Sequence, residues 1–274
     1  MYIIADSGST KCDWMCVEGA SIQTLRTQGI NAALHSPKEV MHSLEELPQT
    51  LKPSRVVFYG AGCGEHFPAA TQTLHNTLSQ HFNTCNIELY SDLLGAARAL
   101  FGRKAGITCI LGTGSNSCYY DGEHIVHNVP PLGYILGDEG SGAALGRKLL
   151  NGLLKGTLGE ELTSVFYATH KLNYEEVIRR VYREPQANRF LASLVPFIYQ
   201  HIETQGIRTL VHNAFREFAE RNLQHYPHAE VAFTGGVATA LETELRAVMI
   251  EQGYRVGRIT ASPAAGLIEY HEGK

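Results

Sequence analysis

The 274-residue sequence lacks several patterns that would assign it at once to a class of protein. No apolar run approaches the roughly 20 residues that a membrane helix needs, and Asp6 interrupts the apolar N-terminal stretch too early for a signal peptide. Charged residues make up only 18% of the chain, the net charge is -4, and the basic residues are scattered. Neither nucleic acid nor an anionic membrane is therefore indicated as a partner. We expect a cytoplasmic globular protein that acts on a small molecule.

Motifs for metal, nucleotide and disulfide chemistry are also missing. There is no GxxxxGK[ST] phosphate-binding loop, and no GxGxxG fingerprint follows the first apolar run. The 13 histidines include no HExxH pair, and the cysteines form no CxxC pair and no zinc-type CxxH spacing. We predict no structural zinc and reduced, mostly buried thiols at all six cysteines: Cys12, Cys16, Cys63, Cys85, Cys109 and Cys118.

What the sequence does contain is an unusual turn near its start, in the stretch MYIIADSGSTKCDW. The apolar run ends at Asp6, and a carboxylate, hydroxyls, a glycine and an ammonium group then share one predicted hairpin turn. Backbone N–H groups in such a turn form a small concave nest that binds anions, and hydroxyls add further donors. An ordinary surface turn with exposed Ser and Thr is the alternative interpretation.

The same pattern occurs twice, which favours a functional interpretation. IIADSGSTKCDWMCVEG aligns with CILGTGSNSCYYDGEHI, so that Gly8 matches Gly114 and Ser9 matches Ser115. Further along, VVFYGAGCG matches VAFTGGVAT, and IELYSDLLGAARAL matches GRITASPAAGLIEY. Self-similarity of this length predicts two copies of one unit of strands followed by alternating helices and strands.

The repeat predicts an α/β fold of two duplicated domains around a cleft. We place the domains at residues 1–105 and 106–274, with a helical insertion at about 140–226 in the second domain. The last helix, 262–272, could pack back on the first domain. In the first copy, the patterns favour helices at 37–50, 65–82 and 92–101.

Here the residues resemble a known superfamily. DSGSTK, LGTGSN and FTGGVAT, in that order, resemble the two phosphate motifs and the adenosine motif of the actin-like ATPases, whose domains are ribonuclease H-like. GYILGDEGSGAALGR resembles the GDEGS segment of N-acetylglucosamine kinases and of the BadF/BadG/BcrA/BcrD ATPase family. The resemblance spans Tyr2 to about Glu269 and implies ATP, Mg²⁺, a sugar substrate and a homodimer. One departure is that Ser7 and Ser9 stand where many relatives have glycine.

The two turns together could hold the phosphates of ATP. Asp6 is expected to hold waters of a Mg²⁺ ion that bridges the phosphates, and Lys11 offers a point charge to the same oxygens. Glycine would let the backbone approach the nucleotide closely. The predicted ATP-binding residues are Ser7, Gly8, Ser9, Thr10, Lys11, Thr113, Gly114, Ser115, Gly235 and Gly236.

Carboxylates and an amide are the candidates for catalysis and sugar binding. Asp92, where a strand meets a helix, is the predicted general base and sugar contact, with helix N-capping as the alternative. The resemblance implies that Asp138 contacts sugar hydroxyls, with Glu139 as support; capping of the next helix is its alternative. Asn31 and Gly60 are further sugar-binding candidates by resemblance, although Asn31 could simply form a turn.

The function expected from these residues is phosphorylation of an amino sugar by ATP, most simply N-acetylglucosamine at its 6-hydroxyl. Kinases of N-acetylmuramic acid or glucosamine are close variants. A second hypothesis is an ATPase activator of a radical dehydratase or reductase, which carries an iron–sulfur cluster on cysteines of both subunits. A third is a sugar sensor without activity, against which Asp6, Asp92 and Asp138 argue.

Overall fold

The computed structural model describes residues 1–8, 10–83 and 86–273 of the chain, which fold as two compact units. Unit 1 comprises Met1–Lys104, Gly122–His124 and Pro263–Lys274. Unit 2 comprises Ala105–Asp121 and Ile125–Ser262. The chain therefore passes between the units more than once, and its C-terminal helix belongs to the same unit as its first strand.

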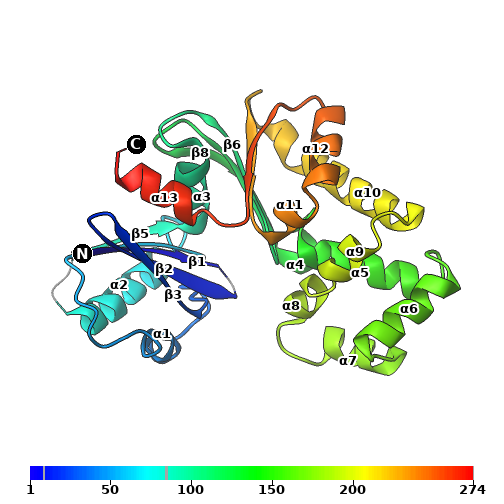
Figure 1. Cartoon of the computed structure of the whole chain (residues 1–274), viewed down its shortest axis with the longest axis horizontal. Coiled ribbons are helices and arrows are strands. Elements are labelled where there is room, and N and C mark those ends of the chain that lie inside the picture. The colour runs from blue at the N-terminus through cyan, green and yellow to red at the C-terminus, as the bar shows by residue number, and fades with distance from the viewer. Residues whose placement is uncertain (9, 84–85, 274) are drawn as a thin grey trace. The chain divides into compact units, whose positions relative to one another are not determined.

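The centre of unit 1 is a five-stranded mixed sheet with the order β3-β2-β1-β4-β5 (Figure 1). The antiparallel strands β1, β2 and β3 follow one another through tight turns, whereas β4 and β5 run parallel to β1. The parallel neighbours bring the carboxyl ends of β1, β4 and β5 to one edge of the sheet. The strands are β1 (Tyr2–Ser7), β2 (Lys11–Glu18), β3 (Ser21–Gln28), β4 (Arg55–Gly60) and β5 (Asn86–Ser91).

Helices cover both faces of this sheet. They are α1 (Pro37–Leu44), α2 (Pro68–Phe82), α3 (Asp92–Phe101) and α13 (Ala264–His271). Alternate residues of β1 point to opposite faces, so Ile3 packs in the core beneath α1 and α2 while Ile4 packs with Ala99 of α3 and Leu267 of α13. Both cores exclude water, which explains the continuous apolar run at the start of the sequence.

Two of the expected helices in unit 1 are longer than the observed ones. The first ends at Leu44 rather than at residue 50, because the residue before Pro48 is disfavoured in helical conformation. The second begins at Pro68 rather than at residue 65, and proline at the first helical position is a common start. The third, 92–101, has the bounds that the sequence predicted.

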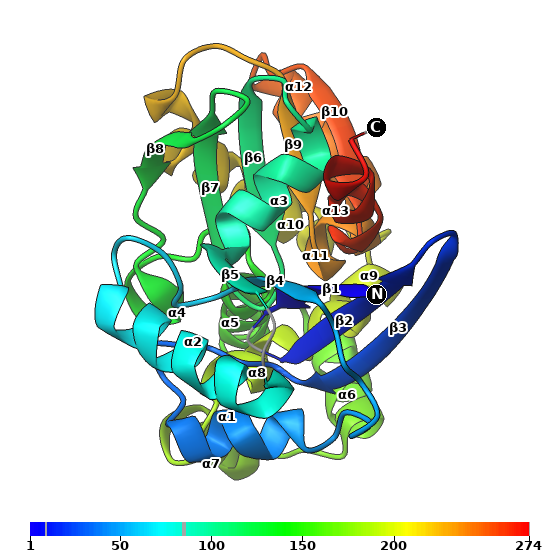
Figure 2. The same cartoon turned by 90° about the vertical axis from the view of Figure 1, so that its left-hand side faces the viewer.

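Unit 2 repeats the topology, which confirms the prediction of a duplicated α/β fold. Its five-stranded sheet has the order β10-β9-β6-β7-β8, the same as in unit 1 when each strand is matched to its copy (Figure 2). Strands β6, β7 and β8 are antiparallel, and β9 and β10 are parallel to β6. They are β6 (Gly106–Leu111), β7 (Ser115–Tyr120), β8 (Ile125–Val129), β9 (Val231–Thr234) and β10 (Val256–Thr260).

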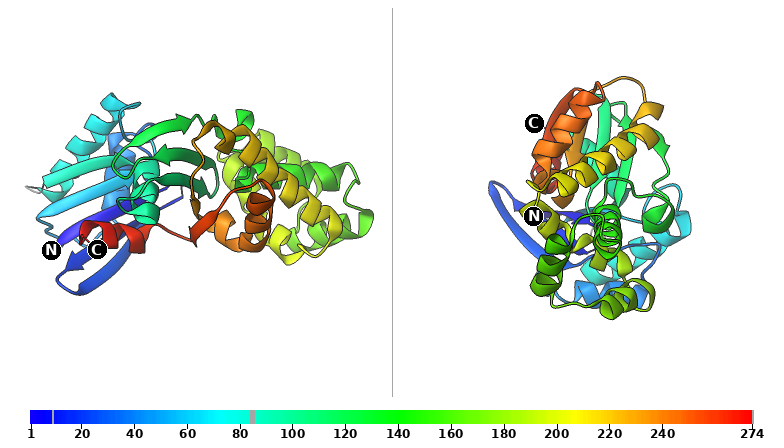
Figure 3. Two further views of the ribbon diagram at one scale, coloured as in Figure 1. Left: turned by 90° about the horizontal axis from the view of Figure 1, so that it is seen from above. Right: turned by 90° about the vertical axis from the view of Figure 1, so that its right-hand side faces the viewer.

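Most of the extra length of unit 2 is helical and lies between β8 and β9. The green-to-yellow helices of Figure 3 pack on one another around a core that includes Phe166, Phe197, Phe215 and Phe218. The helices before β9 are α4 (Gly133–Leu136), α5 (Gly142–Leu154), α6 (Glu160–His170), α7 (Tyr174–Tyr182), α8 (Ala187–Ala192), α9 (Val195–Gln200), α10 (Gln205–Arg221) and the short 3-10 helix η1 (Leu223–His225). After β9 come α11 (Gly236–Ala240) and α12 (Glu242–Glu251).

Candidate active-site elements of the two units

The first phosphate-type turn joins β1 to β2 in unit 1. The backbone N–H of Gly8 donates to the carbonyl of Lys11, which closes the hairpin at 3.1 Å. Gly8 and Thr10 are exposed, and a Cβ added at Gly8 would meet no atom within 4 Å. The turn is thus accessible at Gly8 and Thr10, while the Gly8 N–H itself is used within the hairpin; phosphate binding at this turn stays a prediction. Ser9 lies outside the described residues.

Lys11 has a protein partner at the base of this turn. Its Nζ lies 2.6 Å from one carboxylate oxygen of Asp13, and Arg26 Nε lies 2.7 Å from the other. Burial alone would raise the pKa of Asp13, but the hydrogen bonds from Arg26 and Lys11 outweigh burial and hold that pKa below its usual value. The Lys11 ammonium is therefore held in place by a carboxylate that stays ionised.

Ser7, the residue before the turn, is fully buried. Its hydroxyl donates to the carbonyl of Ile30 at 2.9 Å and accepts from the backbone N–H of Ile30 at 2.8 Å. Ser7 lies in β1 with ordinary strand geometry, so serine imposes no backbone strain at this position. The hydroxyl that the sequence assigned to ATP is engaged by the protein backbone.

Two carboxylates of unit 1 influence one another at the carboxyl edge of the sheet. Burial raises the pKa of Asp6 to about 7, with the negative charges of Asp92 and Asp13 adding to the rise and Lys11 opposing it. Burial also raises the pKa of Asp92. A group whose charge is so poorly compensated fits a place beside a cation, which agrees with the predicted Mg²⁺ contact of Asp6.

Asp92 does not act as the N-cap of α3. That place belongs to Ser91, whose hydroxyl accepts from the backbone N–H of Leu94 at 3.2 Å. Asp92 is the first helical residue, and its Oδ1 accepts from the N–H of Leu93 at 2.8 Å. Ser91 is therefore the N-cap, although the Asp92 carboxylate also accepts from backbone N–H groups at the start of the helix, those of Leu93 and of Asp92 itself.

Asn31 lies on the loop that follows β3. Its Oδ1 accepts from the N–H of Ala33 at 3.0 Å, so the turn-forming role considered for this residue is present. Gly62 (φ +72°) packs against it so closely that an added Cβ would lie 2.4 Å from Asn31 Oδ1. Gly60 ends β4 beside Ser7, and a Cβ there would lie 2.3 Å from the ring of Phe58.

The second phosphate-type turn joins β6 to β7 in unit 2 and is fastened to α5. The carbonyls of Gly112 and Thr113 accept from the N–H groups of Gly142 and Ala143 at 2.8 and 3.0 Å. The N–H of Gly112 donates across the turn to the carbonyl of Gly114 at 2.9 Å. The carbonyls of this turn therefore point into the protein, which leaves its other polar groups for a ligand.

Asp138 touches this second turn directly. A Cβ added at Gly114 would lie 2.9 Å from Asp138 Oδ2, and the N–H of Ser115 donates to the carboxylate. Burial raises the pKa of Asp138 to about 6. The hydrogen bond from Ser115 and the charge of Arg147 lower this pKa, and the charge of Glu139 raises it further.

Asp138 also has a left-handed backbone, with φ +54°. The N-cap of α5 is Ser141, so Asp138 does not cap that helix.

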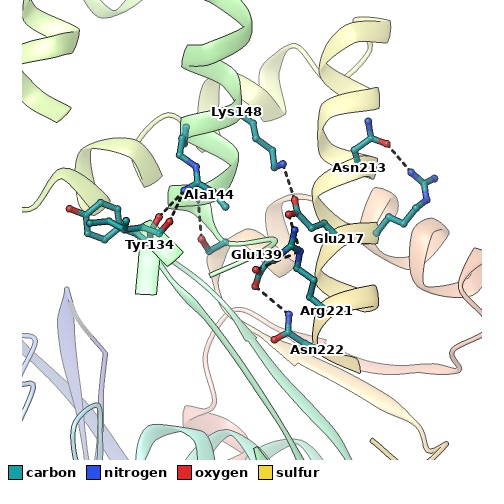
Figure 4. Close-up of polar contacts among 12 residues, drawn as sticks. Tyr134, Glu139, Ala144, Lys148, Asn213, Glu217, Arg221 and Asn222 are labelled. Atoms are coloured by element: carbon teal, nitrogen blue, oxygen red, sulfur yellow. Dashed lines mark hydrogen bonds and ion pairs between the residues drawn. The ribbon is translucent and has the colours of Figure 1, made fainter. Parts of the chain in front are cut away.

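Glu139 fastens the Asp138 loop to α10 (Figure 4). Its carboxylate lies 3.5 Å from Asn222 Nδ2 and 3.9 Å from Arg221 Nε, and Arg221 also pairs with Glu217 at 3.2 Å. The buried Asn222 and its neighbour Arg221 were missed by sequence reasoning. Because they lie some 80 residues away on another helix, only the fold brings them to Glu139.

Gly235 lies between β9 and α11, and Gly236 is the first residue of α11. Gly235 has φ +122°, and an added Cβ would lie 2.3 Å from the carbonyl oxygen of Leu111 at the end of β6. Glycine is therefore required at 235 by close packing of backbone on backbone. Gly236 is open, since an added Cβ there would meet nothing within 4 Å.

Comparisons with known proteins place this chain in a family. A candidate N-acetylglucosamine kinase from Porphyromonas gingivalis is 42% identical, with a TM-score of 0.95, and the match covers 100% of this chain and 99% of that one. A candidate N-acetylglucosamine kinase from Chromobacterium violaceum matches at 20% identity and a TM-score of 0.71, over 98% of both chains. A scan against protein-family models and a search of curated proteins returned no match.

The fold itself is shared more widely. A glucokinase of the ROK family from Streptomyces griseus, solved with glucose and AMPPNP, matches over 99% of this chain and 98% of that one, at 14% identity and a TM-score of 0.58. The fold is that of the actin-like ATPases. The chain belongs to the N-acetylglucosamine kinase-like family of this superfamily, a class of ATP-dependent sugar kinases. Within the described residues, no helix combines the length and hydropathy needed to cross a membrane.

Proposed function

We propose that this protein transfers the γ-phosphoryl group of ATP to the 6-hydroxyl of N-acetylglucosamine. The observation that carries the proposal is the pair Asp92 and Asp6, two partly buried carboxylates of unit 1 whose charges are close enough to raise the pKa of Asp6. Phosphoryl transfer needs one group to receive the proton of the acceptor hydroxyl and another to hold the metal of Mg-ATP. Family membership supports the choice of a sugar as the acceptor.

Asp92 is the proposed general base. Its Oδ1 accepts from the N–H of Leu93, and the carboxylate would take the proton from the sugar hydroxyl. Burial raises the pKa of Asp92, which makes its carboxylate a better proton acceptor than an exposed one. The fixed position at the start of α3 would keep the accepting oxygen aligned with the incoming hydroxyl.

The remaining predicted residues have roles in binding. Open backbone at Gly8 and Thr10, with the Lys11 charge, would hold phosphate oxygens in unit 1, and the turn at Gly114 would do so in unit 2. Mg²⁺, held by Asp6 through water, would supply charge neutralisation to the phosphates. Asp138 would accept hydrogen bonds from sugar hydroxyls.

Two further contacts complete the proposed site. Asn31 would donate from its amide nitrogen to the sugar, since its oxygen is used in the turn. Gly236 offers open backbone to the nucleotide. The cytoplasmic location and the homodimer remain predictions.

The test is a screen that couples ADP release to a spectroscopic signal, over N-acetylglucosamine, glucosamine, N-acetylmuramic acid, N-acetylmannosamine and glucose. We expect N-acetylglucosamine to give the highest kcat/KM, and product analysis to place the phosphate on O6. Asp92→Asn should abolish the signal, whereas Glu88→Gln, a matched carboxylate on β5 paired with Arg55, should retain it. ADP release that no sugar stimulates would refute the proposal.

The iron–sulfur activator is disfavoured by the cysteines. The five that the structure describes, Cys12, Cys16, Cys63, Cys109 and Cys118, are all buried, so none of them is exposed on a surface that two subunits could share. Cys85 lies outside the described residues. An absorbance band near about 400 nm from protein purified without oxygen would favour the activator.

A further inference from the structure

The structure assigns to Ser7 a role on the sugar side of the reaction: we propose that Ser7 positions the Asn31 loop and does not bind ATP through its hydroxyl. This inference rests on the proposed function, because it concerns how the acceptor is held. The inference gives Ser7 a different role from Gly8, Thr10 and Lys11, the other described members of the first turn, which are proposed to bind phosphate.

The first argument is accessibility. The side chain of Ser7 is fully buried, so a phosphate oxygen has no route to its hydroxyl in this fold. Gly8 and Thr10, by contrast, are exposed. One predicted phosphate turn therefore contains two kinds of residue, and only the exposed kind can meet a nucleotide directly.

The second argument is that the hydroxyl is engaged by the protein. It donates to the Ile30 carbonyl and accepts from the Ile30 N–H, at 2.9 and 2.8 Å, which satisfies both backbone groups of one residue. No strand ladder reaches Ile30, because β3 ends at Gln28. Without Ser7, both buried groups of Ile30 would lose their partner, at a cost that exceeds the gain from an ordinary surface hydrogen bond.

The third argument is that Ser7 holds Asn31 from both sides. Ile30, before Asn31, is bound by the Ser7 hydroxyl. Ala32, after Asn31, donates to the carbonyl of Ala61 at 3.0 Å, and Ala61 in turn donates to the carbonyl of Ser7 at 3.2 Å. A closed ring of hydrogen bonds thus starts and ends at Ser7 and fixes the backbone that carries the Asn31 amide.

The same ring relates the first turn to the loop after β4. Ala61 directly follows Gly60, and Gly62 packs against Asn31 Oδ1. A glycine in place of Ser7 could not make the side-chain part of this ring. In this chain, the Ser7 side chain adds a hydrogen-bonded link between the phosphate turn and the loop predicted to hold the acceptor sugar, so acceptor binding is where its loss should appear.

The test separates KM for sugar from KM for ATP. We expect Ser7→Ala and Ser7→Gly to raise the sugar KM by roughly tenfold, the effect of about one buried hydrogen bond, and to change the ATP KM by less than about twofold. Thr10→Ala, an exposed member of the same turn, should give the opposite pattern. A raised ATP KM with an unchanged sugar KM in both Ser7 variants would overturn the inference.

Two further measurements identify the route of the effect. If Ser7 acts through Asn31, the double variant with Ser7→Ala and Asn31→Ala should have nearly the same sugar KM as Asn31→Ala alone. If the two residues acted independently, their fold-changes in sugar KM would multiply. Amide hydrogen exchange of the segment 29–34, measured without ligands, should be faster in Ser7→Ala than in wild type. An unchanged exchange rate would contradict the proposal that Ser7 holds this segment. Wild-type protein that phosphorylates no sugar would refute the proposed function, and the exchange result would still decide the role of Ser7.

Discussion

Replacing Asp138 by asparagine should stabilise unit 2, and increasingly so as the pH rises. The folded protein holds the pKa of Asp138 at about 6, against a usual value of 3.8, because the carboxyl group is buried. A raised pKa means that the folded state favours the protonated form. Stability is therefore lost as the pH increases from about 4 to about 6, and the full cost remains at neutral pH.

The magnitude follows from the size of this rise. One pH unit of pKa corresponds to about 1.4 kcal/mol, so a rise from 3.8 to about 6 costs about 3 kcal/mol at pH 8 as an upper value. At about pH 5 the cost is roughly half of that, because both states are then partly protonated. Asparagine carries no charge, tolerates the left-handed backbone at 138, and can accept from the Ser115 N–H through its amide oxygen.

Urea unfolding at about pH 5 and pH 8 measures the effect. We expect the free energy of unfolding of Asp138→Asn to exceed that of wild type by a margin that grows by about 1.5 kcal/mol between the two pH values. Far-UV circular dichroism reports the helices of both units, most of which belong to unit 2. Fluorescence of Trp14, the single tryptophan, reports unit 1 and should be unaffected by the substitution.

A matched control removes an exposed carboxylate. Glu251→Gln deletes the α12 partner of Arg216 and should not stabilise the protein. If the difference in unfolding free energy between Asp138→Asn and wild type stays constant or becomes smaller from pH 5 to pH 8, the reasoning is refuted. Asp138→Asn should also lose sugar phosphorylation. The charge of Asp138, although it destabilises the fold, would then be retained because it is needed for sugar binding.

Three other substitutions test separate parts of the structure. Asp92→Asn should lower kcat by roughly 10² to 10⁴ while calorimetry finds ATP affinity within a few-fold of wild type; a near-normal kcat would remove Asp92 as base. Gly62→Ala, whose Cβ would lie 2.4 Å from Asn31 Oδ1, should raise the sugar KM, and an unchanged KM would count against the loop's role. Gly266→Ala puts a Cβ 2.1 Å from the Ala99 carbonyl, so trypsin should release the C-terminal helix faster; equal cleavage rates would show that α13 adapts.

Much of the architecture could be predicted because its signals are local and occur twice. The apolar run before Asp6 and the glycine-rich turn after it recur before and after Gly114, and each copy became the first hairpin of a sheet with the same strand order. The carboxyl ends of β1, β4 and β5 then had to meet at one edge, which places Asp6 and Asp92 in one neighbourhood.

What the sequence could not give were contacts made by the fold between distant segments. Ser7 and Ile30 are 23 residues apart, and nothing in either segment distinguishes a buried hydroxyl from one that meets phosphate. Asp13 was within reach of prediction, because a hairpin closed between Gly8 and Lys11 sets Asp13 directly opposite Asp6. The N-cap of α3 was also local, since Ser91 precedes Asp92 and serine caps helices as well as aspartate does.

The two turns have similar sequences but different attachments, and this difference decides where an anion can bind in unit 2. A helix N-terminus near a phosphate turn usually offers its free N–H groups to the anion. At α5 those groups are already used: Gly142 and Ala143 donate to the carbonyls of the second turn, and Ala144 donates to the Ser141 hydroxyl. The next N–H, of Leu145, donates to the Ser141 carbonyl. In the proposed function, the donors to phosphate in unit 2 must therefore come from the turn itself, with α5 serving to hold it.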